Sequence, residues 1–389
     1  MRMKKLMILA VAAIAMAACT KTYDKVETPQ SPIGFGTWMD VLTKARATGS
    51  TTTSFANNEM FKVYGTKLVS STPYEVFNGT DIKATVGESV SWNYNNAADI
   101  RYWDRAATSY TFYAALPGSM VTAYSSLTAA QKEAISNTEY PFNGKFYGSF
   151  TFDDPTAINN DVLVANETTV EVNNTNVKSD VQLQFNHIAS SVSLLAKKDV
   201  ALQSATVTVT DVKFKSIKKS GDFHVSGYST GVPTVDWNNQ TSVLATSPSL
   251  DTYTAVSGGN IAVSAYSSYG TEDPADPNAV NTTTNSPVSL LSGYVFLPQG
   301  FTAETEQILL SYTIAVGSEQ PSVYTDVPID LIAFMTSDHN DNNGGSPINE
   351  WEPGKHYIYT VTIGANAITF TASVKNWAAT VDGYNYLIN

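Results

Sequence analysis

Two short patterns in the sequence have the residue types and spacing of serine nucleophiles. Residues 227–231, GYSTG, fit G-x-S-x-G, in which the serine acts from a turn between a strand and a helix. Val232 and Pro233 follow, and then strand-like residues, so the helix that this chemistry requires cannot begin there. Residues 216–219, SIKK, fit S-x-x-K without a K-T-G or S-D-N element. We predict a tight turn at the first pattern and a chance match at the second.

Side chains that bind metals are few and are not grouped. The segment 337–345, SDHNDNNGG, offers carboxylate and amide oxygens but lacks the glycine and glutamate spacing of a calcium loop. One cysteine supplies no ligand set for structural zinc. The 35 acidic residues show no spacing that marks a catalytic pair. We expect no enzyme activity, no cofactor and no metal site, with calcium at 337–345 as the weaker alternative. The four histidines show no H-x-H or i, i+4 pairing: His187, His224, His339 and His356.

The single cysteine, Cys19, ends a segment with the three parts of a secretory signal peptide. Three basic residues stand among the first five, residues 6–15 are apolar, and small residues precede the cysteine. The apolar run is too short for a stable membrane span. The junction resembles a bacterial lipobox, with Met16 where leucine is usual. We predict that residues 1–18 are removed and that Cys19 carries acyl chains such as palmitate, which anchor the protein to a membrane. An ordinary signal peptide with a stray cysteine is the alternative.

The charge balance argues against binding to nucleic acid. Lys and Arg number 23 and Asp and Glu number 35, which gives a net charge of −12. No basic stripe with interleaved aromatic residues is present. We therefore expect no nucleic-acid partner.

Strands rather than helices must position these residues. Only 15% of the chain is charged, and Thr, Ser, Asn, Val and Tyr recur in period-two alternation between Gly, Asn, Asp and Pro. The best helix candidate is SSLTAAQKEAI, where Thr128 and Gln131 form a capping box. The pattern predicts an all-β fold of two β-sandwich domains with one or two short helices.

A polar stretch at residues 173–180 divides the chain near its middle. We therefore predict an N-terminal domain over residues 19–178 and a C-terminal domain over residues 179–389. The first strand is expected at about 33–41, followed by a polar loop at about 43–53. Alternation places four apolar residues of the first strand on one face: Ile33, Phe35, Met39 and Val41. A second face is predicted within the strand-like segment 366–389: Ile368, Phe370, Ala372 and Val374.

The order of these segments resembles the fimbrillin-like lipoproteins of Bacteroidetes, the subunits of protease-matured surface pili. The resemblance runs from the signal peptide to the C-terminus and rests on the order and spacing of several segments together. The segments that carry it, in order, are PIGFGTWMD, the arginine in TKARATGS, YWDRAATSYTFYAALPG, VQLQFNHIASSVSLL, VFLPQGF and WEPGKHYIYTVTIGANAITFTASVKNW.

The resemblance implies a transthyretin-like, Greek-key-type topology in both domains and delivery to the outer membrane as a surface-exposed lipoprotein. It also implies that an arginine-specific protease cuts between Arg46 and Ala47 and releases the first strand. The emptied groove then accepts a strand from another fimbrial subunit, and the 366–389 segment is the candidate donor. Partners would be other fimbrial subunits, the outer membrane through the lipid, and host or bacterial surface ligands in adhesion.

Two other functions remain as alternatives. A glycan-binding outer-membrane lipoprotein would use aromatic side chains such as Trp92, Trp103 or Tyr384 to stack on sugars. A hydrolase has no coherent set of residues to support it. Among fimbrial roles, stalk, tip and anchor subunits share the fold, so the sequence leaves this choice open.

Overall fold

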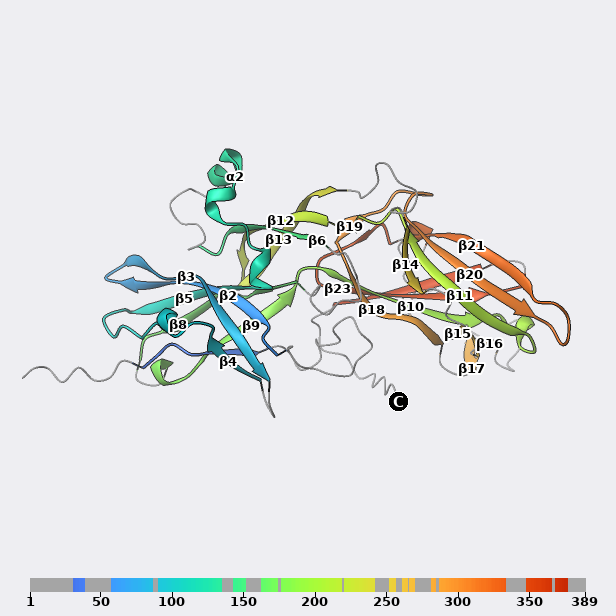
Figure 1. The fold of residues 1–389 in the computed structure, drawn as a ribbon, viewed down its shortest axis with the longest axis horizontal. Coiled ribbons are helices and arrows are strands. Elements are labelled where there is room, and N and C mark those ends of the chain that lie inside the picture. The colour runs from blue at the N-terminus through green and yellow to red at the C-terminus, as the bar shows by residue number, and fades with distance from the viewer. Residues whose placement is uncertain are drawn as a thin grey trace, which may run out of the picture.

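The computed structural model has an all-β fold drawn out along one axis (Figure 1). The structure describes residues 31–38, 57–86, 90–134, 143–151, 162–173, 176–218, 220–241, 252–256, 261–264, 266–269, 281–284, 287–333, 348–365 and 368–376. Two β-rich halves lie side by side, with a smaller sheet between them. The predicted all-β sandwich class is confirmed.

The N-terminal half is built on one eight-stranded sheet with the order β1-β9-β7-β5-β2-β3-β4, and β8 pairs with β5. The sheet curves so far that β1 and β4, at the two ends of this path, contact each other. Its buried core is rich in aromatic residues, which alternate with outward-facing polar residues along the strands. The strands are β1 (Phe35–Trp38), β2 (Met60–Val69), β3 (Thr72–Val86), β4 (Val90–Tyr94), β5 (Ser109–Leu116), β7 (Leu163–Ala165), β8 (Thr168–Glu171) and β9 (Val181–His187).

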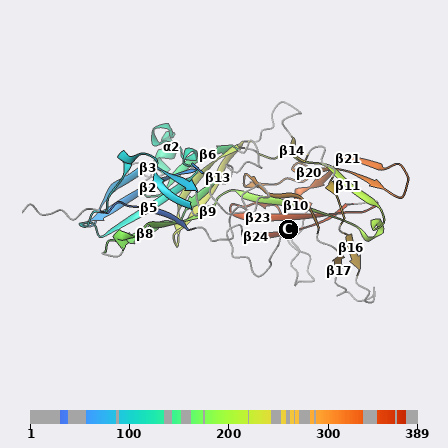
Figure 2. The same cartoon turned by 60° about the horizontal axis from the view of Figure 1, so that its bottom comes forward.

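The C-terminal half is a sandwich of a six-stranded and a five-stranded sheet, which enclose one apolar core (Figure 2). The six-stranded sheet contains β10 (Ser190–Lys198), β16 (Tyr266–Tyr269), β17 (Asn281–Thr284), β18 (Val288–Phe296), β23 (Lys355–Ile363) and β24 (Ile368–Asn376). The five-stranded sheet contains β11 (Thr206–Lys215), β14 (Thr252–Val256), β15 (Ile261–Ala262), β20 (Gln307–Ala315) and β21 (Ser322–Asp330). A two-stranded pair completes this half: β19 (Gln299–Gly300) and β22 (Glu350–Trp351).

A three-stranded sheet joins the two halves. It contains β6 (Phe146–Thr151), β12 (Ser220–Ser229) and β13 (Val232–Thr241), so its strands come from distant parts of the sequence. Phe223 on β12 lies in a core cluster with Val164 of the N-terminal half and Leu297 from the segment after β18. Because one apolar cluster takes side chains from both halves, the halves are packed together rather than merely linked by chain.

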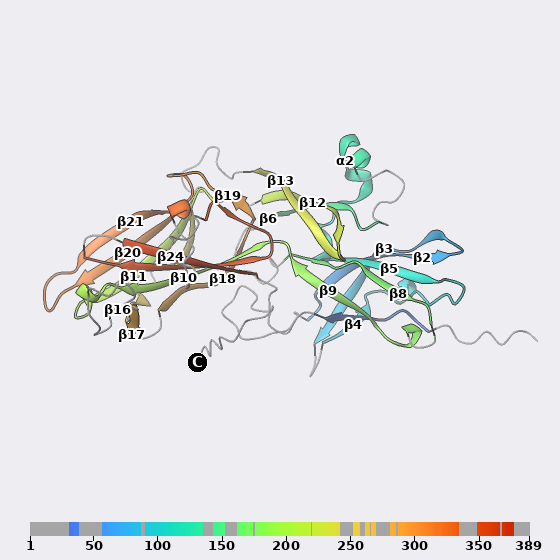
Figure 3. The same cartoon turned by 180° about the vertical axis from the view of Figure 1, so that it is seen from behind.

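The strand pairing places the boundary between the two halves later than the predicted domain boundary between residues 178 and 179. β9, which begins at Val181, lies between β1 and β7 in the N-terminal sheet, and the chain enters the second sheet only at β10 (Figure 3). The polar stretch 173–180 connects β8 to β9 within one sheet, and a 3-10 turn occupies Asn176–Lys178. Polar composition therefore marks a surface connection here, and the change of sheet falls at Ile188 and Ala189, which are buried.

Helical structure in the described part is limited to short elements. The predicted capping box is present at α2 (Ala129–Ala134): Thr128 N donates to Gln131 Oε1 at 2.9 Å, and Gln131 N donates to Thr128 Oγ1 at 3.2 Å. No helix among the described residues is long and apolar enough to cross a membrane. The 3-10 turns are η1 (Ala97–Asp99), η2 (Gly118–Met120), η3 (Tyr124–Ser126), η5 (Asn176–Lys178), η6 (Val200–Leu202) and η7 (Leu331–Ala333).

Replacing Phe223 by alanine should lower the free energy of unfolding by about 3–5 kcal/mol, because it empties the centre of the cluster that joins the halves. Its ring lies 5.1 Å from that of Trp237 and is 1% exposed. Chemical denaturation measures the change. The control is Tyr74→Ala, an aromatic truncation at a side chain that is 50% exposed, which should cost less than about 1 kcal/mol. Equal effects of the two substitutions would contradict the packed junction.

Candidate functional site

The inward face of β1 fills a groove of aromatic side chains. Ile33 is fully buried and Phe35 is 3% exposed. The Phe35 ring meets four other rings nearly edge to face, which is the favoured aromatic geometry. The distances between ring centroids are 5.5 Å to Phe77, 5.8 Å to Phe112, 6.2 Å to Phe61 and 6.3 Å to Tyr94. Phe35 is therefore the central anchor of the strand.

Within the part of the chain that the structure describes, the backbone of β1 pairs with one strand, β9. β1 runs parallel to β9 over four residue pairs, from Phe35 and Val181 to Trp38 and Gln184. Val181 N also donates to Gly34 O at 2.9 Å. Just before the strand, Ile33 N donates to the carbonyl oxygen of Arg101 at 2.8 Å. A ladder this short contributes little to holding β1 in place compared with its buried side chains.

Glycines alternate with the anchors on the outward face of β1. A Cβ at Gly34 would collide with the carboxylate of Asp180, and one at Gly36 would lie 2.5 Å from Gln182 Nε2. These β9-side groups lie over the outer face of β1 because the glycines leave room for them. The IGFG sequence thus combines large inward residues with an outward face that has no side chains.

Two donors on β4 bind β1 from the side opposite β9. Tyr94 Oη donates to the carbonyl oxygen of Ile33 at 2.7 Å, and Trp92 Nε1 donates to Thr37 Oγ1 at 2.8 Å. The Trp92 ring packs on that of Phe61 at 4.8 Å. Burial raises the pKa of Tyr94 to about 12, so the hydroxyl keeps the proton that it donates. β1 is therefore held by a backbone ladder on one side and by side-chain donors on the other.

This arrangement has the chemistry of a binding groove for a strand. Its polar groups bind a peptide backbone and one hydroxyl, and the remaining surface is apolar. Among the described residues, no group of three or more His, Cys, Asp and Glu side chains is placed to hold a metal.

The structure brings together two of the four residues predicted for the first-strand face. Phe35 lies on the buried face of β1 and Ile33 is buried two residues before the strand, whereas Met39 and Val41 lie outside the described residues. Cys19, Arg46 and Ala47 also lie outside the described residues. Their predicted roles in lipidation and proteolysis stay predictions.

The predicted C-terminal face belongs to β24, an outer strand of the six-stranded sheet. β24 pairs antiparallel with β23 over nine residue pairs, from Ile363 and Ile368 to Lys355 and Asn376. Ala372 is 2% exposed, and Ile368 and Val374 pack against the core of the C-terminal half. The side chain of Phe370 lies outside the described part of the chain. β24 is thus already engaged within its own sheet.

The GYSTG segment and two of the histidines, His224 and His356, have structural roles in the sheets. The GYSTG segment forms the β12–β13 hairpin turn, in which Thr230 and Gly231 have positive φ, so the predicted tight turn is confirmed. Ser193 Oγ lies 2.9 Å from His356 Nε2, and it also accepts a hydrogen bond from Gly293 N at 2.8 Å. The buried hydroxyl therefore links three neighbouring strands. His224 stacks on Tyr147 at 4.2 Å, and burial lowers its pKa.

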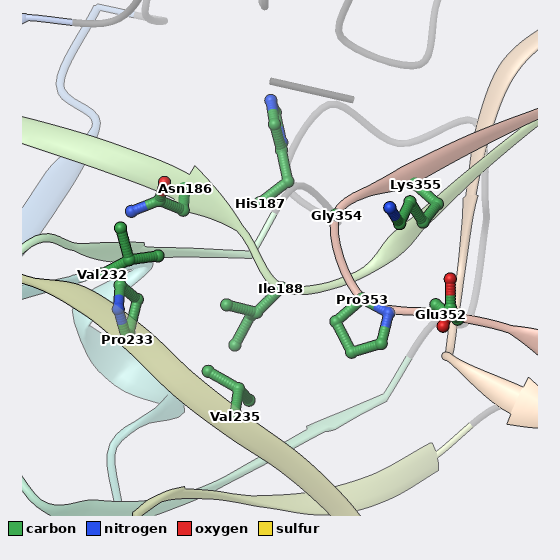
Figure 4. A pocket seen from close by; sticks show the side chains of 10 residues that line it. All are labelled: Asn186, His187, Ile188, Val232, Pro233, Val235, Glu352, Pro353, Gly354 and Lys355. Atoms are coloured by element: carbon green, nitrogen blue, oxygen red, sulfur yellow. The ribbon is translucent and has the colours of Figure 1, made fainter. Parts of the chain in front are cut away.

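A cavity of about 520 Å³ lies at the junction of the two halves (Figure 4). Ile188 and Val235 form an apolar floor, and the His187 side chain points away from it. Hydrogen bonds fix the surrounding backbone: Trp237 Nε1 donates to Ile188 O at 2.6 Å, and Gly354 N donates to Ala189 O at 2.8 Å. Among the described residues that line this cavity, no catalytic set of side chains converges, and the cavity is part of the junction.

Sequence reasoning did not assign the β4 donors to the groove. Trp92 was a candidate for sugar stacking, but it is directed to Thr37 and Phe61. Trp103 is 2% exposed and packs on Tyr110 at 4.8 Å, so its candidacy for sugar stacking is wrong. The alternation in VSWNY is the sequence signal that places Trp92 and Tyr94 on one face. Tyr384 lies outside the described residues.

A family model described as fimbrillin-like matches residues 45–377. A fimbrial protein from Bacteroides vulgatus is similar at 16% identity over 89% of this chain and 99% of that chain, with a TM-score of 0.45. A fimbrilin from Porphyromonas gingivalis is similar at 10% identity over 91% and 99% of the two chains, with a TM-score of 0.37. The tip fimbrial protein Mfa3 of that organism is similar at 9% identity over 83% and 95%, with a TM-score of 0.32. No curated protein matches the chain.

The raised pKa of Tyr94 predicts a loss of stability at alkaline pH. Its ordinary value is 10.0, and in the folded protein the value is about 12. The unfolded chain therefore releases this proton first, and the stabilisation, complete below pH 10, falls as the pH rises from about 10 towards 12. Comparison with Tyr94→Phe by tyrosinate absorbance should show one fewer late-titrating tyrosine in the variant. Identical titration curves would contradict the burial of this hydroxyl against β1.

Proposed function

The chain belongs to the fimbrillin-like family, and on that premise we propose that it is a structural subunit of surface fimbriae that assembles by strand exchange. The observation that supports this best is β1 itself, which ends the sheet path and fills a groove with Ile33 and Phe35. Once β1 leaves, this groove becomes a site that another subunit can occupy. The family also supports association with other fimbrial subunits at the cell surface.

The energetics of β1 favour exchange over simple loss. Full burial of a side chain such as Ile33 or Phe35 is worth about 1.5–3 kcal/mol, so removing both exposes a strongly apolar groove. Val181 N and the rest of the β9 edge lose their backbone partners at the same time. An unpaired edge beside an apolar groove is a template for an incoming strand. A donor strand with alternating apolar residues restores both contributions.

Proteolysis at Arg46 would start this exchange. Arg46 stands in ARATGSTTTS, a stretch of small and polar residues that follows β1 and suits cleavage by an arginine-specific protease. Cleavage before Ala47 would release β1 together with Cys19 and its lipid. Lipidation then serves delivery to the outer membrane, and the cleaved subunit is retained by its neighbours in the fimbrium.

The donor strand would come from residues 366–389 of a second subunit. β24 pairs along its whole length with β23, so donating it would expose Tyr357, Tyr359 and Val361 of the C-terminal core. A donor taken from residues 377–389 would not require the described pairing of β23 with β24 to break. The proposal also includes adhesion to host or bacterial surfaces, and this part rests on membership of the family.

Replacing Arg46 by glutamine should abolish maturation and the polymer that depends on it. We expect the wild-type protein recovered from cells to begin at Ala47 and to form a high-mass ladder in SDS. The Arg46→Gln protein should begin at the lipidated Cys19 and remain monomeric. N-terminal sequencing and gel electrophoresis measure both outcomes.

Lys44→Gln is the matched control, because it removes a neighbouring positive charge without removing the arginine. It should leave cleavage and the ladder unchanged. A ladder of undiminished size from Arg46→Gln protein would rule out cleavage at Arg46 as the step that opens the groove.

A further inference from the structure

The groove is lined by two side-chain donors that bind different kinds of acceptor. Tyr94 Oη donates to a backbone carbonyl, that of Ile33, which every residue type possesses. Trp92 Nε1 donates to a side-chain oxygen, that of Thr37, which only some residue types can supply. The bond from Tyr94 is therefore open to a strand of any sequence, whereas the bond from Trp92 depends on the side chain at the Thr37 position.

We propose that Trp92 is the specificity-determining residue of the groove, which selects a strand with an oxygen-bearing side chain at the Thr37 position, while Tyr94 binds the backbone of any strand. The proposal rests on the proposed strand exchange, and the partner is a strand of a second copy of this chain. An indole N–H is a donor only, so Thr, Ser, Asn or Asp satisfies it and an aliphatic residue does not. The indole cannot easily turn away, because its ring is packed on Phe61 at 4.8 Å.

The selected pattern has three defined positions. Two large apolar residues occupy the sites of Ile33 and Phe35, and the oxygen-bearing residue lies two positions beyond the second. A strand that lacks the oxygen leaves a half-buried N–H without its acceptor, which costs more than the hydrogen bond itself is worth. Apolar alternation alone is therefore insufficient for tight binding.

The C-terminal segment contains this pattern only in reverse. Read in the direction of β1, residues 368–372 (ITFTA) place Ala372 at the Thr37 position, where it offers no side-chain oxygen. Read in reverse, Asn366 accompanies Ile368 and Phe370. The same reversed spacing recurs in DGYNY at residues 382–386. The chain thus favours a donor strand that runs opposite to β1.

A double-mutant cycle in the intact chain tests the contact itself. Thr37→Val keeps the shape of the side chain and removes the acceptor, so it should reduce the folding equilibrium constant about tenfold. Thr37→Ser, the matched control, keeps the oxygen and should change it much less. In a Trp92→Phe background, which keeps a ring against Phe61, Thr37→Val should have almost no effect. An equal loss in both backgrounds would overturn the role of Trp92.

Peptide binding tests selectivity on protein from which β1 has been removed by cleavage after Arg46. The peptide of residues 31–41 should bind about tenfold more tightly than its Thr37→Val form, and Trp92→Phe protein should bind both alike. A peptide of residues 364–374 should likewise lose about tenfold on Asn366→Leu. Equal binding of all peptides would overturn selectivity and leave strand exchange standing. Failure of every peptide to bind would overturn strand exchange, while the cycle in the intact chain would still decide whether Trp92 recognises Thr37.

Discussion

The insertion of Phe35 among four aromatic rings is the contact on which the N-terminal half depends. β1 lies at one end of the sheet path, and its anchors and side-chain partners bring it against β4 at the other end. The core is thus closed by a strand whose described ladder covers only four residue pairs. We infer that most of its stabilisation comes from buried side chains, which in the proposed exchange another strand of the same alternation would supply.

These contacts suit the proposed strand exchange, in which β1 is bound in the intact subunit and is later replaced. A long ladder on both sides would make β1 a permanent part of the sheet, whereas one ladder and two side-chain donors leave one flank to specific contacts. The C-terminal half is a complete sandwich without β1, and the shared cluster around Phe223 joins it to the N-terminal half. Under the proposed strand exchange, loss of β1 would open a local groove in the N-terminal half, since the core of the C-terminal half and the shared cluster contain no residue of β1.

Local patterns in the sequence predicted individual strands and the helix α2, but they did not predict which strands pair with each other. Alternation identified Ile33 and Phe35 as one face, and the capping box identified α2, because both are encoded by residues a few positions apart. The pairing of β12 with β6, and of β9 with β1, joins distant segments, and composition near residue 178 gave a different division. The roles of Trp92 and Tyr94 depend on β1 and β4 meeting across the closed sheet, which no local pattern encodes.

Hydrogen exchange at β9 tests most directly whether β1 is a removable closing strand. The backbone amides of Val181–His187 should be protected in the intact chain and should exchange much faster after cleavage at Arg46 and removal of β1. Protection should return when a peptide of residues 31–41 is added, or when the cleaved protein polymerises. Unchanged protection of β9 after β1 has gone would contradict the account, because the groove would then have closed without a strand.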